Sequence, residues 1–181
     1  MFGGIRAVHD ELASIPGVMN VAVNTRPPLT EEILSAAQAE GRNLRPWELP
    51  LTTWPTVDSE YFGIMRIPLR AGRLFRDDGE TERVAVISES AAQILWPGED
   101  PIGKRVHRPP SPQLWRVIGV VGDVRSTGLD RVPKPAIYRS FNQKGGDGYG
   151  GTSFSIVLRS ALPPDVLAKP VRDAIWRVDP D

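Results

Sequence analysis

Residues 84–105 read VAVISESAAQILWPGEDPIGKR, and this stretch decides the fold. Its first four residues form an uninterrupted apolar run bounded by charge, which is typical of a β-strand that is buried on both faces. Ser88 follows as a helix cap, because its hydroxyl can accept a hydrogen bond from a backbone N–H of the first turn. The pattern then predicts a helix as far as Trp96, where Pro97-Gly98 ends it. A strand followed by a helix and a second strand indicates a mixed α/β domain.

Upstream of this stretch, the spacing of apolar residues and the positions of turn residues predict five elements. Apolar residues at helical spacing favour helices, Val-rich runs favour strands, and Pro-Gly pairs mark the ends. The expected elements are a helix over 5–15, a strand over 18–23, a helix over 30–39, an extended segment over 51–57, and a helical turn over 58–65 that Asp58 or Ser59 caps.

Downstream, the same signals predict two pairs of strands and a final helix. Residues 104–107 and 115–121 should pair as antiparallel strands, and residues 137–141 and 154–158 should form two strands around a glycine-rich hairpin tip at 144–151. An amphipathic helix over 164–178 should follow. Helices alternate with strands throughout, so we expect one mixed α/β domain that covers residues 1–181.

Composition excludes several classes of function. The chain of 181 residues carries 22 Lys and Arg against 22 Asp and Glu, so no net charge steers it toward nucleic acid or anionic lipid. With no Cys, it has no disulfide and no thiolate nucleophile or metal ligand. Its longest uncharged stretch, residues 12–25, is interrupted by Pro16-Gly17 and is shorter than the roughly 20 residues of a membrane span.

Two glycine motifs suggest phosphate binding but fail the test of context. Residues 98–104 satisfy GxxxxGK, yet Arg105 stands where a phosphate-binding loop has Ser or Thr, and the motif follows a helix instead of preceding one. Gly146, Gly148 and Gly151 satisfy GxGxxG, but they lie between two expected strands with no helix after them. We interpret the first motif as a turn that ends a helix and the second as a hairpin tip.

No group of residues predicts catalysis, a metal site or a cofactor. His9 and His107 lie far apart in sequence, and the loop carboxylates Asp77, Asp78 and Glu80 lack the spacing of a calcium loop. Ser88 and Ser90 have no base placed beside them by the sequence.

Two tryptophans differ from the others in lying in Pro-flanked segments. Since binding residues are found more often on loops than in the scaffold, we expect Trp47 and Trp54 to be contacts for a ligand or partner.

One ordered set of segments is far more specific than these motifs. Residues 57–73 resemble the "V-x-x-x-Y-F…G-I-P-L-x-x-G-R" passage of MacB-like periplasmic core domains. Residues 84–95, the WPGEDPIGKR string at 96–105 and the strand at 117–125 are similar to the segments that follow in that family. The resemblance covers roughly residues 5–25 and 55–181, and a peripheral insert at about 26–50 departs from the pattern.

The resemblance implies a two-lobed α+β fold, with a porter-like βαβ lobe and a second, smaller lobe. It implies an extracytoplasmic domain of an ABC-transporter permease in the bacterial inner membrane, without catalysis of its own or a cofactor. The implied partners are the permease's own transmembrane helices, a cytoplasmic ATPase subunit, and a periplasmic adaptor or envelope protein. Both chain ends should then lie on one side of the domain. The alternative is a periplasmic module that binds a small molecule or peptide near Trp47 and Trp54.

Overall fold

The computed structural model describes residues 2–25, 33–76, 79–125, 132–141, 143 and 154–178. Its helices are α1 (Phe2–Ala13), α2 (Tyr61–Ile64), α3 (Glu89–Leu95) and α4 (Pro164–Val178), with a 3-10 turn, η1 (Pro46–Glu48). Its strands are β1 (Val18–Asn24), β2 (Leu34–Ala36), β3 (Gln38–Ala39), β4 (Leu51–Thr53), β5 (Thr56–Val57), β6 (Leu69–Gly72), β7 (Val84–Ser88), β8 (Arg105–His107), β9 (Leu114–Val121), β10 (Ile137–Ser140) and β11 (Ser155–Ser160).

Most of these strands join one mixed sheet. Within the described residues its order is β11-β1-β5-β10-β7-β9-β8-β3, and β6 pairs with β9 off this path. The pairs β7–β9 and β5–β10 are parallel and the others antiparallel, while β2 and β4 form a separate antiparallel pair. The fold is therefore a mixed α/β domain, as the sequence predicted.

Strand β7 lies at the centre of this sheet, between β10 and β9, and all five of its residues are buried. Its side chains alternate between two apolar clusters: Val84 and Val86 belong to the one that includes α2, and Ala85 and Ile87 to the one that includes α3. Side chains of a strand point alternately to opposite faces, so β7 is covered on both sides. The expectation of a doubly buried strand over 84–87 is confirmed.

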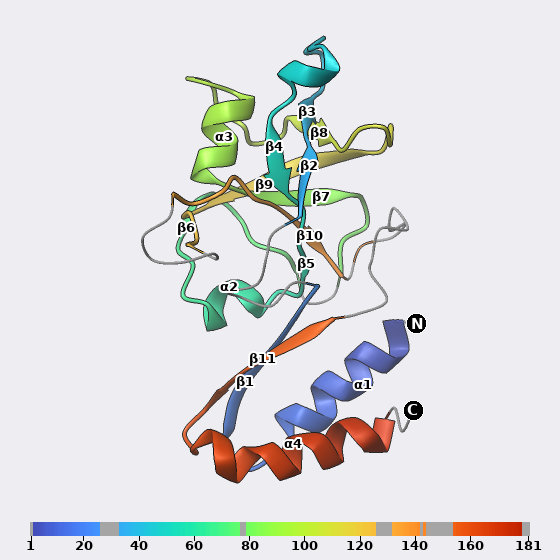
Figure 1. The fold of residues 1–181 in the computed structure, drawn as a ribbon, viewed down its shortest axis with the longest axis vertical. Coiled ribbons are helices and arrows are strands. Elements are labelled where there is room, and N and C mark those ends of the chain that lie inside the picture. Colours follow the sequence, from blue (N-terminus) through green and yellow to red (C-terminus); the bar gives the residue numbers. More distant parts are fainter. Residues whose placement is uncertain are drawn as a thin grey trace.

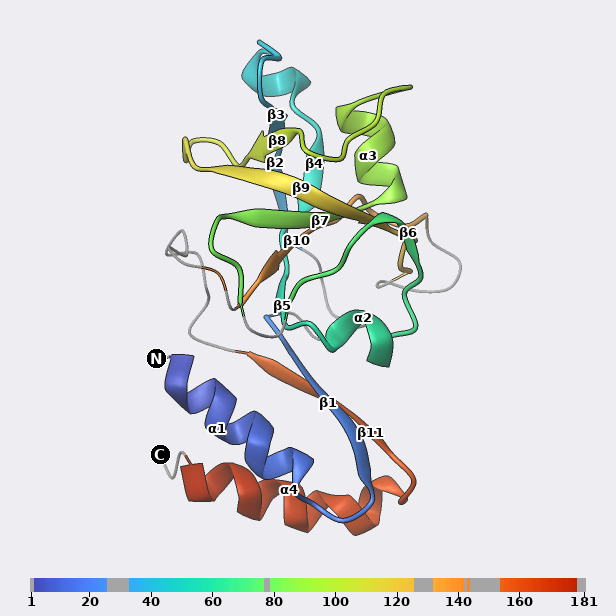
Figure 2. The same ribbon diagram turned by 180° about the vertical axis from the view of Figure 1, so that it is seen from behind.

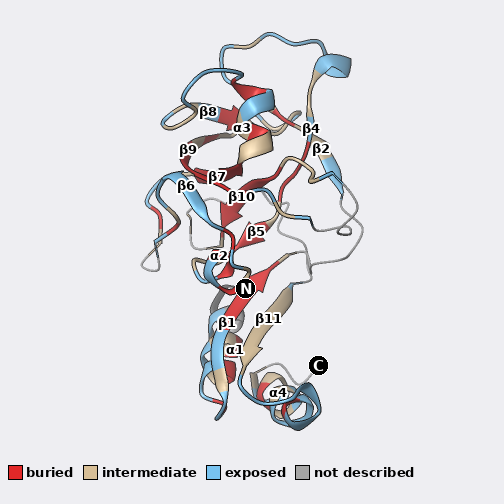
Figure 3. Ribbon diagram, turned by 90° about the vertical axis from the view of Figure 1, so that its left-hand side faces the viewer, coloured by how far each residue is buried: buried red, intermediate tan, exposed pale blue. Residues whose placement is uncertain are grey.

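The chain packs around these clusters as a larger head and a smaller base. We call α1, β1, β11 and α4 the base, and the remaining elements the head (Figures 1 and 2). The base has its own apolar cluster, in which helices and strands face each other: Val8, Leu12, Ile15, Val21, Leu167 and Ala174. Figure 3 shows buried ribbon concentrated in the centre of the head and along the upper part of β1.

The two ends of the chain meet in the base. Helices α1 and α4 pack together, and the Arg177 guanidinium donates to the Glu11 carboxylate at 2.8 Å. The labelled N and C ends lie on the same side of the base in Figures 1 and 2, as expected. None of the helices in the described residues has the length and apolar character needed to cross a bilayer.

Two expectations about local structure are wrong. The helix expected over 30–39 is replaced, in its described part, by β2 and β3, because Ala37 and Ala39 are buried against the α3 side of the sheet while β2 pairs with β4 and β3 pairs with β8. Strands β10 and β11 do not pair with each other, since β10 lies between β5 and β7 and β11 pairs with β1. The glycine-rich tip at 144–151 lies outside the described residues.

Candidate functional site

The base and the head share very little of the sheet. Strand β1 pairs with β11 from Val18 to Asn24, but within the described residues it pairs with β5 of the head only at Asn24↔Val57. Two backbone hydrogen bonds flank that pair: Thr25 N–H donates to Thr56 O at 3.0 Å, and Asp58 N–H donates to Val23 O at 3.1 Å. We call this crossing point the junction, because it carries the sheet from one part of the molecule to the other.

The Asp58 side chain completes the junction. Its Oδ2 accepts a hydrogen bond from Val23 N–H at 2.6 Å, and its Oδ1 accepts from Tyr61 N–H, at the start of α2, at 3.0 Å. One carboxylate thus connects the C-terminal end of β1 to the first turn of α2 in the head. Burial raises the pKa of this carboxyl above its ordinary value, against the opposing effect of the Val23 N–H and of His9 in α1.

The two tryptophans expected as contacts lie in different environments and are not brought together. Trp47 in η1 is 76% exposed, with the Arg45 guanidinium 5.7 Å from its ring centre, and η1 lies at the end of the head farthest from the base (Figure 1). Trp54 is only 7% exposed, and its ring packs edge-on against Trp115 at 5.4 Å between centroids. Their role as partner contacts stays a prediction, and the exposed surface available for it belongs mainly to Trp47.

The WPGEDPIGKR segment forms a turn between α3 and β8. Trp96 is buried at the end of α3, and Gly98 and Gly103 have φ values of +75° and +84°, which favour glycine. Gly103 N–H donates to Val117 O at 2.8 Å, so this amide is used within the sheet and does not face a phosphate. The Glu99 carboxylate accepts hydrogen bonds from Lys104 and from Arg42. The interpretation of this segment as a structural turn is confirmed.

The serines and histidines considered for catalysis have structural partners. Ser88 Oγ accepts hydrogen bonds from the backbone of Ala91 and of Ala136, at 3.3 and 3.0 Å, which confirms it as the cap of α3. Ser90 Oγ donates to Asp123 at 2.6 Å. The His107 ring contacts the backbone oxygen of Ser111 at 3.0 Å. The hydrogen bonds of Ser88 and Ser90 given above do not involve this ring.

The carboxylates of the loop before β7 also have structural roles where they are described. Glu80 is buried and accepts two hydrogen bonds from the Arg73 guanidinium, at 2.7 and 3.0 Å. Asp77 and Asp78 lie outside the described residues. Across the residues that the structure does describe, no three metal-ligating side chains gather at one point.

The sequence predicted Asp58 or Ser59 as the cap of α2, whereas Glu60 takes the N-cap position and the Asp58 carboxylate accepts from Tyr61 N–H in the first turn. The second partner of Asp58, Val23, was not predicted. Val23 is 35 positions away in sequence, and no local pattern relates the two residues. The single-pair crossing at Asn24↔Val57 is equally invisible in the sequence, because strand partners are set by the tertiary fold.

Comparisons with known proteins agree with this architecture. The family model for the MacB-like periplasmic core domain matches residues 5–178. The chain is 35% identical over 75 residues to the macrolide export ATP-binding/permease protein MacB of Aggregatibacter actinomycetemcomitans, an alignment that covers 40% of this chain and 11% of that protein. The chain therefore corresponds to a small part of this curated relative.

Two solved structures share the fold at low sequence identity. The periplasmic region of MacB from Actinobacillus actinomycetemcomitans superposes with a TM-score of 0.68 and 20% identity, over 96% of this chain and 73% of that one. The extracellular domain of the noncanonic ABC-type transporter YknZ from Gram-positive bacteria superposes with a TM-score of 0.66 and 20% identity, over 94% and 81%.

Proposed function

The chain belongs to the MacB-like periplasmic core domain family, and from this premise we propose that it transmits conformational change within an ABC permease. It is the periplasmic or extracellular domain of a MacB-like permease. We propose that it has no catalysis of its own and that it couples ATP hydrolysis in the cytoplasm to export or to mechanical signalling across the envelope. Its partners would be the transmembrane helices of the same permease, a cytoplasmic ATPase subunit, and a periplasmic adaptor or envelope protein.

The observation that carries this proposal is the narrow junction between base and head. A sheet that continues through several paired residues resists bending, whereas within the described residues the sheet crosses from base to head only at the pair Asn24↔Val57 and its flanking hydrogen bonds. Beside this crossing, Ala22 of β1 packs in the apolar cluster of the head. Rigid-body rotation of packed units about a small interface is a common form of conformational switching. We therefore propose the base and head as the two lobes that move.

The arrangement of the base supports the same proposal. Helices α1 and α4 hold the two chain ends on one side of the molecule, so movement of segments attached to those ends would act first on the base (Figures 1 and 2). In the head, β7 and β9 are parallel neighbours, and the connection between them contains α3 and the antiparallel strand β8. We assign this βαβ-type crossover as the porter-like lobe.

The reading frame that encodes this chain provides a first test. A permease should supply a hydrophobic segment of about 20 residues on each side of the domain. If the gene has no such segment on either side, the assignment to a permease is wrong.

The movement itself can be measured in the full-length permease with its ATPase. The 181-residue chain has no cysteine, so cysteines introduced for spin labels would be the only label sites within this domain. We would label exposed Met19 in the base and exposed Ile94 in the head, and compare the nucleotide-free state with an ATP-bound state that cannot hydrolyse ATP. The proposal predicts that the distance distribution shifts between the two states.

A matched pair within the head is the control. The side chains of Ile94 and Leu51 are both exposed and both lie in the head, so the distance between labels at these two positions should be the same in both states. Equal distributions for the base-to-head pair in the two states would refute movement at the junction.

One observation favours a second candidate function, a module that binds a small molecule or peptide. The exposed indole of Trp47 at the far end of the head is a surface that a ligand could contact. Trp47→Ala should then abolish ligand-induced stabilisation in a thermal-shift screen while the ligand-free melting temperature stays unchanged.

A further inference from the structure

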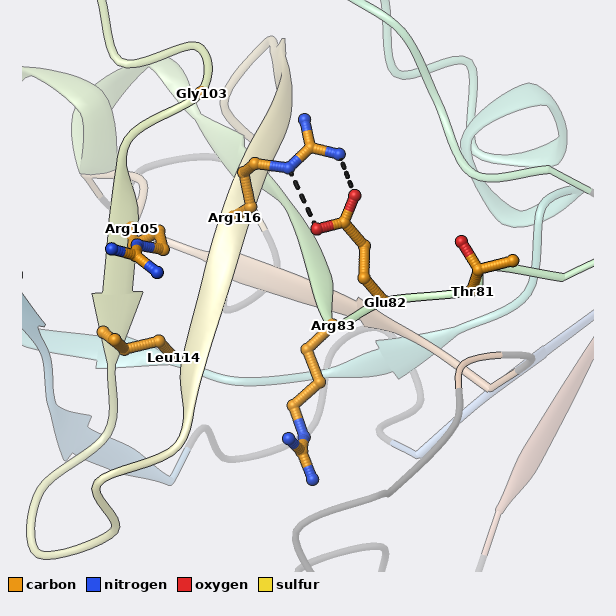
Figure 4. A pocket seen from close by; sticks show the side chains of 7 residues that line it. All are labelled: Thr81, Glu82, Arg83, Gly103, Arg105, Leu114 and Arg116. Carbon is orange, nitrogen blue, oxygen red and sulfur yellow. Dashed lines mark hydrogen bonds and ion pairs between the residues drawn. The ribbon is translucent and has the colours of Figure 1, made fainter.

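The head is connected across its strands by ion pairs as well as by its sheet. Arg105 on β8 faces Arg116 on β9, and each of these side chains donates to a carboxylate. Arg116 donates to Glu82 at the open pocket shown in Figure 4, and Arg105 donates to Glu40 at 2.7 Å. These contacts join β9 to the segment before β7, and β8 to the residue after β3, so they support the head as one unit.

Helix α4 of the base differs, because a proline lies in its interior. Pro170 is near the middle of this 15-residue helix. A proline nitrogen carries no hydrogen, so the carbonyl oxygen of Val166, four residues earlier, loses its helical donor, and the proline ring crowds that carbonyl. Both residues are exposed to solvent. Pro170 therefore divides α4 into a first segment, 164–169, and a second segment, 171–178.

The first segment is tied to the strands of the base. Ala161 N–H, shortly before this segment, donates to the backbone oxygen of Gly17 at 3.0 Å, and Ser160 Oγ donates to the same oxygen at 2.8 Å. Gly17 directly precedes β1. Within the segment, the Leu167 side chain is buried in the apolar cluster of the base. We therefore expect the first segment to stay in place on the β1–β11 pair.

The second segment is tied to α1. The Arg177 guanidinium donates to the Glu11 carboxylate through Nε and Nη2, at 3.1 and 2.8 Å. Ala174 is fully buried in the same apolar cluster as Val8 of α1. We call α1 and residues 171–178 the end unit, because together they carry both ends of the described chain.

A turn separates α1 from β1, as Pro170 separates the two segments of α4. The turn contains Pro16 and Gly17, and Gly17 has a φ of +90°, a conformation that favours glycine. The Leu162 side chain packs against it so closely that a Cβ atom on Gly17 would lie 2.5 Å from Leu162 Cδ1. The end unit thus meets the β1–β11 pair at two joints that each contain a proline.

We propose that the end unit pivots on the β1–β11 pair about Pro170 and the Pro16-Gly17 turn, and that movement enters the base at this pivot. The proposal deepens the proposed function and rests on it for the direction of the signal, from the chain ends to the head. Small sliding of packed helices about a few hinge residues is a common form of such movement.

One contact spans the break in α4. The Lys169 ammonium group donates to the Asp173 carboxylate at 2.6 Å, from one segment to the other. Lys169 is 83% exposed, and exposed ion pairs of this kind stabilise a structure only slightly. This pair would therefore not prevent α4 from bending at Pro170.

Hydrogen exchange of the full-length permease, measured by mass spectrometry, tests the joint at Pro170. Pro170→Ala supplies the missing N–H and makes α4 continuous. Exchange of the backbone amides of 171–174 should slow at least about tenfold, because a proline in the interior strongly destabilises a helix. Pro164→Ala is the matched control, since a proline at the first helical position replaces an N–H that the helix does not use, and it should leave this exchange unchanged.

Spin-label distances test the pivot in the full-length permease with its ATPase. A label at exposed Met19, on β1, is paired with a label at exposed Trp176 in the second segment or at exposed Val166 in the first. Between the nucleotide-free state and an ATP-bound state that cannot hydrolyse ATP, the Met19–Trp176 distribution should shift and the Met19–Val166 distribution should not. Pro170→Ala should reduce the Met19–Trp176 shift.

The exchange experiment decides the joint without reference to the proposed function. Equal exchange at 171–174 in the wild type and Pro170→Ala, or the same slowing by Pro164→Ala, would overturn the proposal. Equal shifts of the two label pairs would also overturn it, because α4 would then move as one rigid helix.

The base-to-head pair of labels, at Met19 and Ile94, separates this proposal from the proposed function. If that pair shifts and the Met19–Trp176 pair does not, the pivot is wrong and the proposed function stands. If the Met19–Trp176 pair shifts and the base-to-head pair does not, the pivot stands and transmission to the head is wrong. No shift in either pair would refute both.

Discussion

Replacement of Asp58 by asparagine should weaken the junction between base and head. The carboxylate accepts one hydrogen bond at each oxygen, from Val23 N–H and from Tyr61 N–H. Asparagine has one acceptor oxygen, and its amide nitrogen would face the second N–H as another donor. One partly buried N–H would lose its partner, which destabilises a protein by about 1–3 kcal/mol. With urea m-values of about 1–3 kcal/mol/M for small domains, the unfolding midpoint should fall by roughly 1 M.

The effect of Asp58→Asn should also depend on pH. Burial raises the pKa of the Asp58 carboxyl above its ordinary value of 3.8, so the folded state binds this proton more tightly than the unfolded state does. The stability that the wild type gains from the protonated group is complete below the ordinary pKa and is lost as pH rises through the raised one. The difference in unfolding free energy between wild type and Asp58→Asn should therefore be largest in acid and shrink toward a constant value near neutrality.

Urea unfolding followed by tryptophan fluorescence between pH 4 and 7 measures both quantities. Glu60→Gln is the matched control, because this neighbouring carboxylate is exposed and its loss should change stability by less than about 0.5 kcal/mol. A difference that grows as pH rises would refute the reasoning, because it would mean that the hydrogen bonds to the charged carboxylate outweigh its burial. An Asp58→Asn variant as stable as the wild type would refute the role of the side chain in the junction.

Three further predictions concern the head. Gly119→Ala should destabilise the domain by about 1–3 kcal/mol, because a Cβ atom there would lie 2.2 Å from a backbone carbonyl oxygen, whereas Gly63→Ala has open space and should leave the melting temperature unchanged or raise it. Trp115→Ala should cost about 3–5 kcal/mol in chemical denaturation, since this fully buried indole contacts the α3 side of the core. The hydrogen bond from Lys104 lowers the pKa of the Glu99 carboxyl, so Lys104→Met should raise that pKa toward its ordinary value in a carboxyl NMR titration.

The elements that were predictable from sequence are those whose determinants are local. The apolar run at 84–87, the Ser88 cap and the Pro-Gly stop after Trp96 each depend on neighbouring residues, and all three are confirmed. The amphipathic helix expected over 5–15 is also confirmed as α1, whose Val8 and Leu12 are buried.

The expectations that failed depended on partners far along the chain. Residues 33–39 are rich in good helix formers, yet the burial of Ala37 and Ala39 and the pairing of Ala39 with Val106 of the distant strand β8 outweigh the small helix propensity. Adjacent strands usually pair, but β11 pairs with β1 instead of β10. The opposed pair Arg105↔Arg116 was likewise hidden, because no sequence pattern fixes the register that brings the two residues together.

Under the proposed function, the topology would make the junction the place where base and head communicate. Strands β1 and β11 come from opposite ends of the chain and pair along most of their length, so the base closes on itself and the head is inserted between them. The base cluster includes residues from both terminal helices, so a force on either end would be carried by packed side chains into the β1–β11 pair. From there, in the part of the chain that the structure describes, the sheet continues into the head only through Asn24↔Val57. The Asp58 carboxylate, the packing of Ala22 and contacts of α2 lie beside that pair. Under the proposed function, a change at the Asp58 carboxylate would alter how the head follows the base, whereas a change at Val57 would also disturb the apolar cluster of the head to which it belongs.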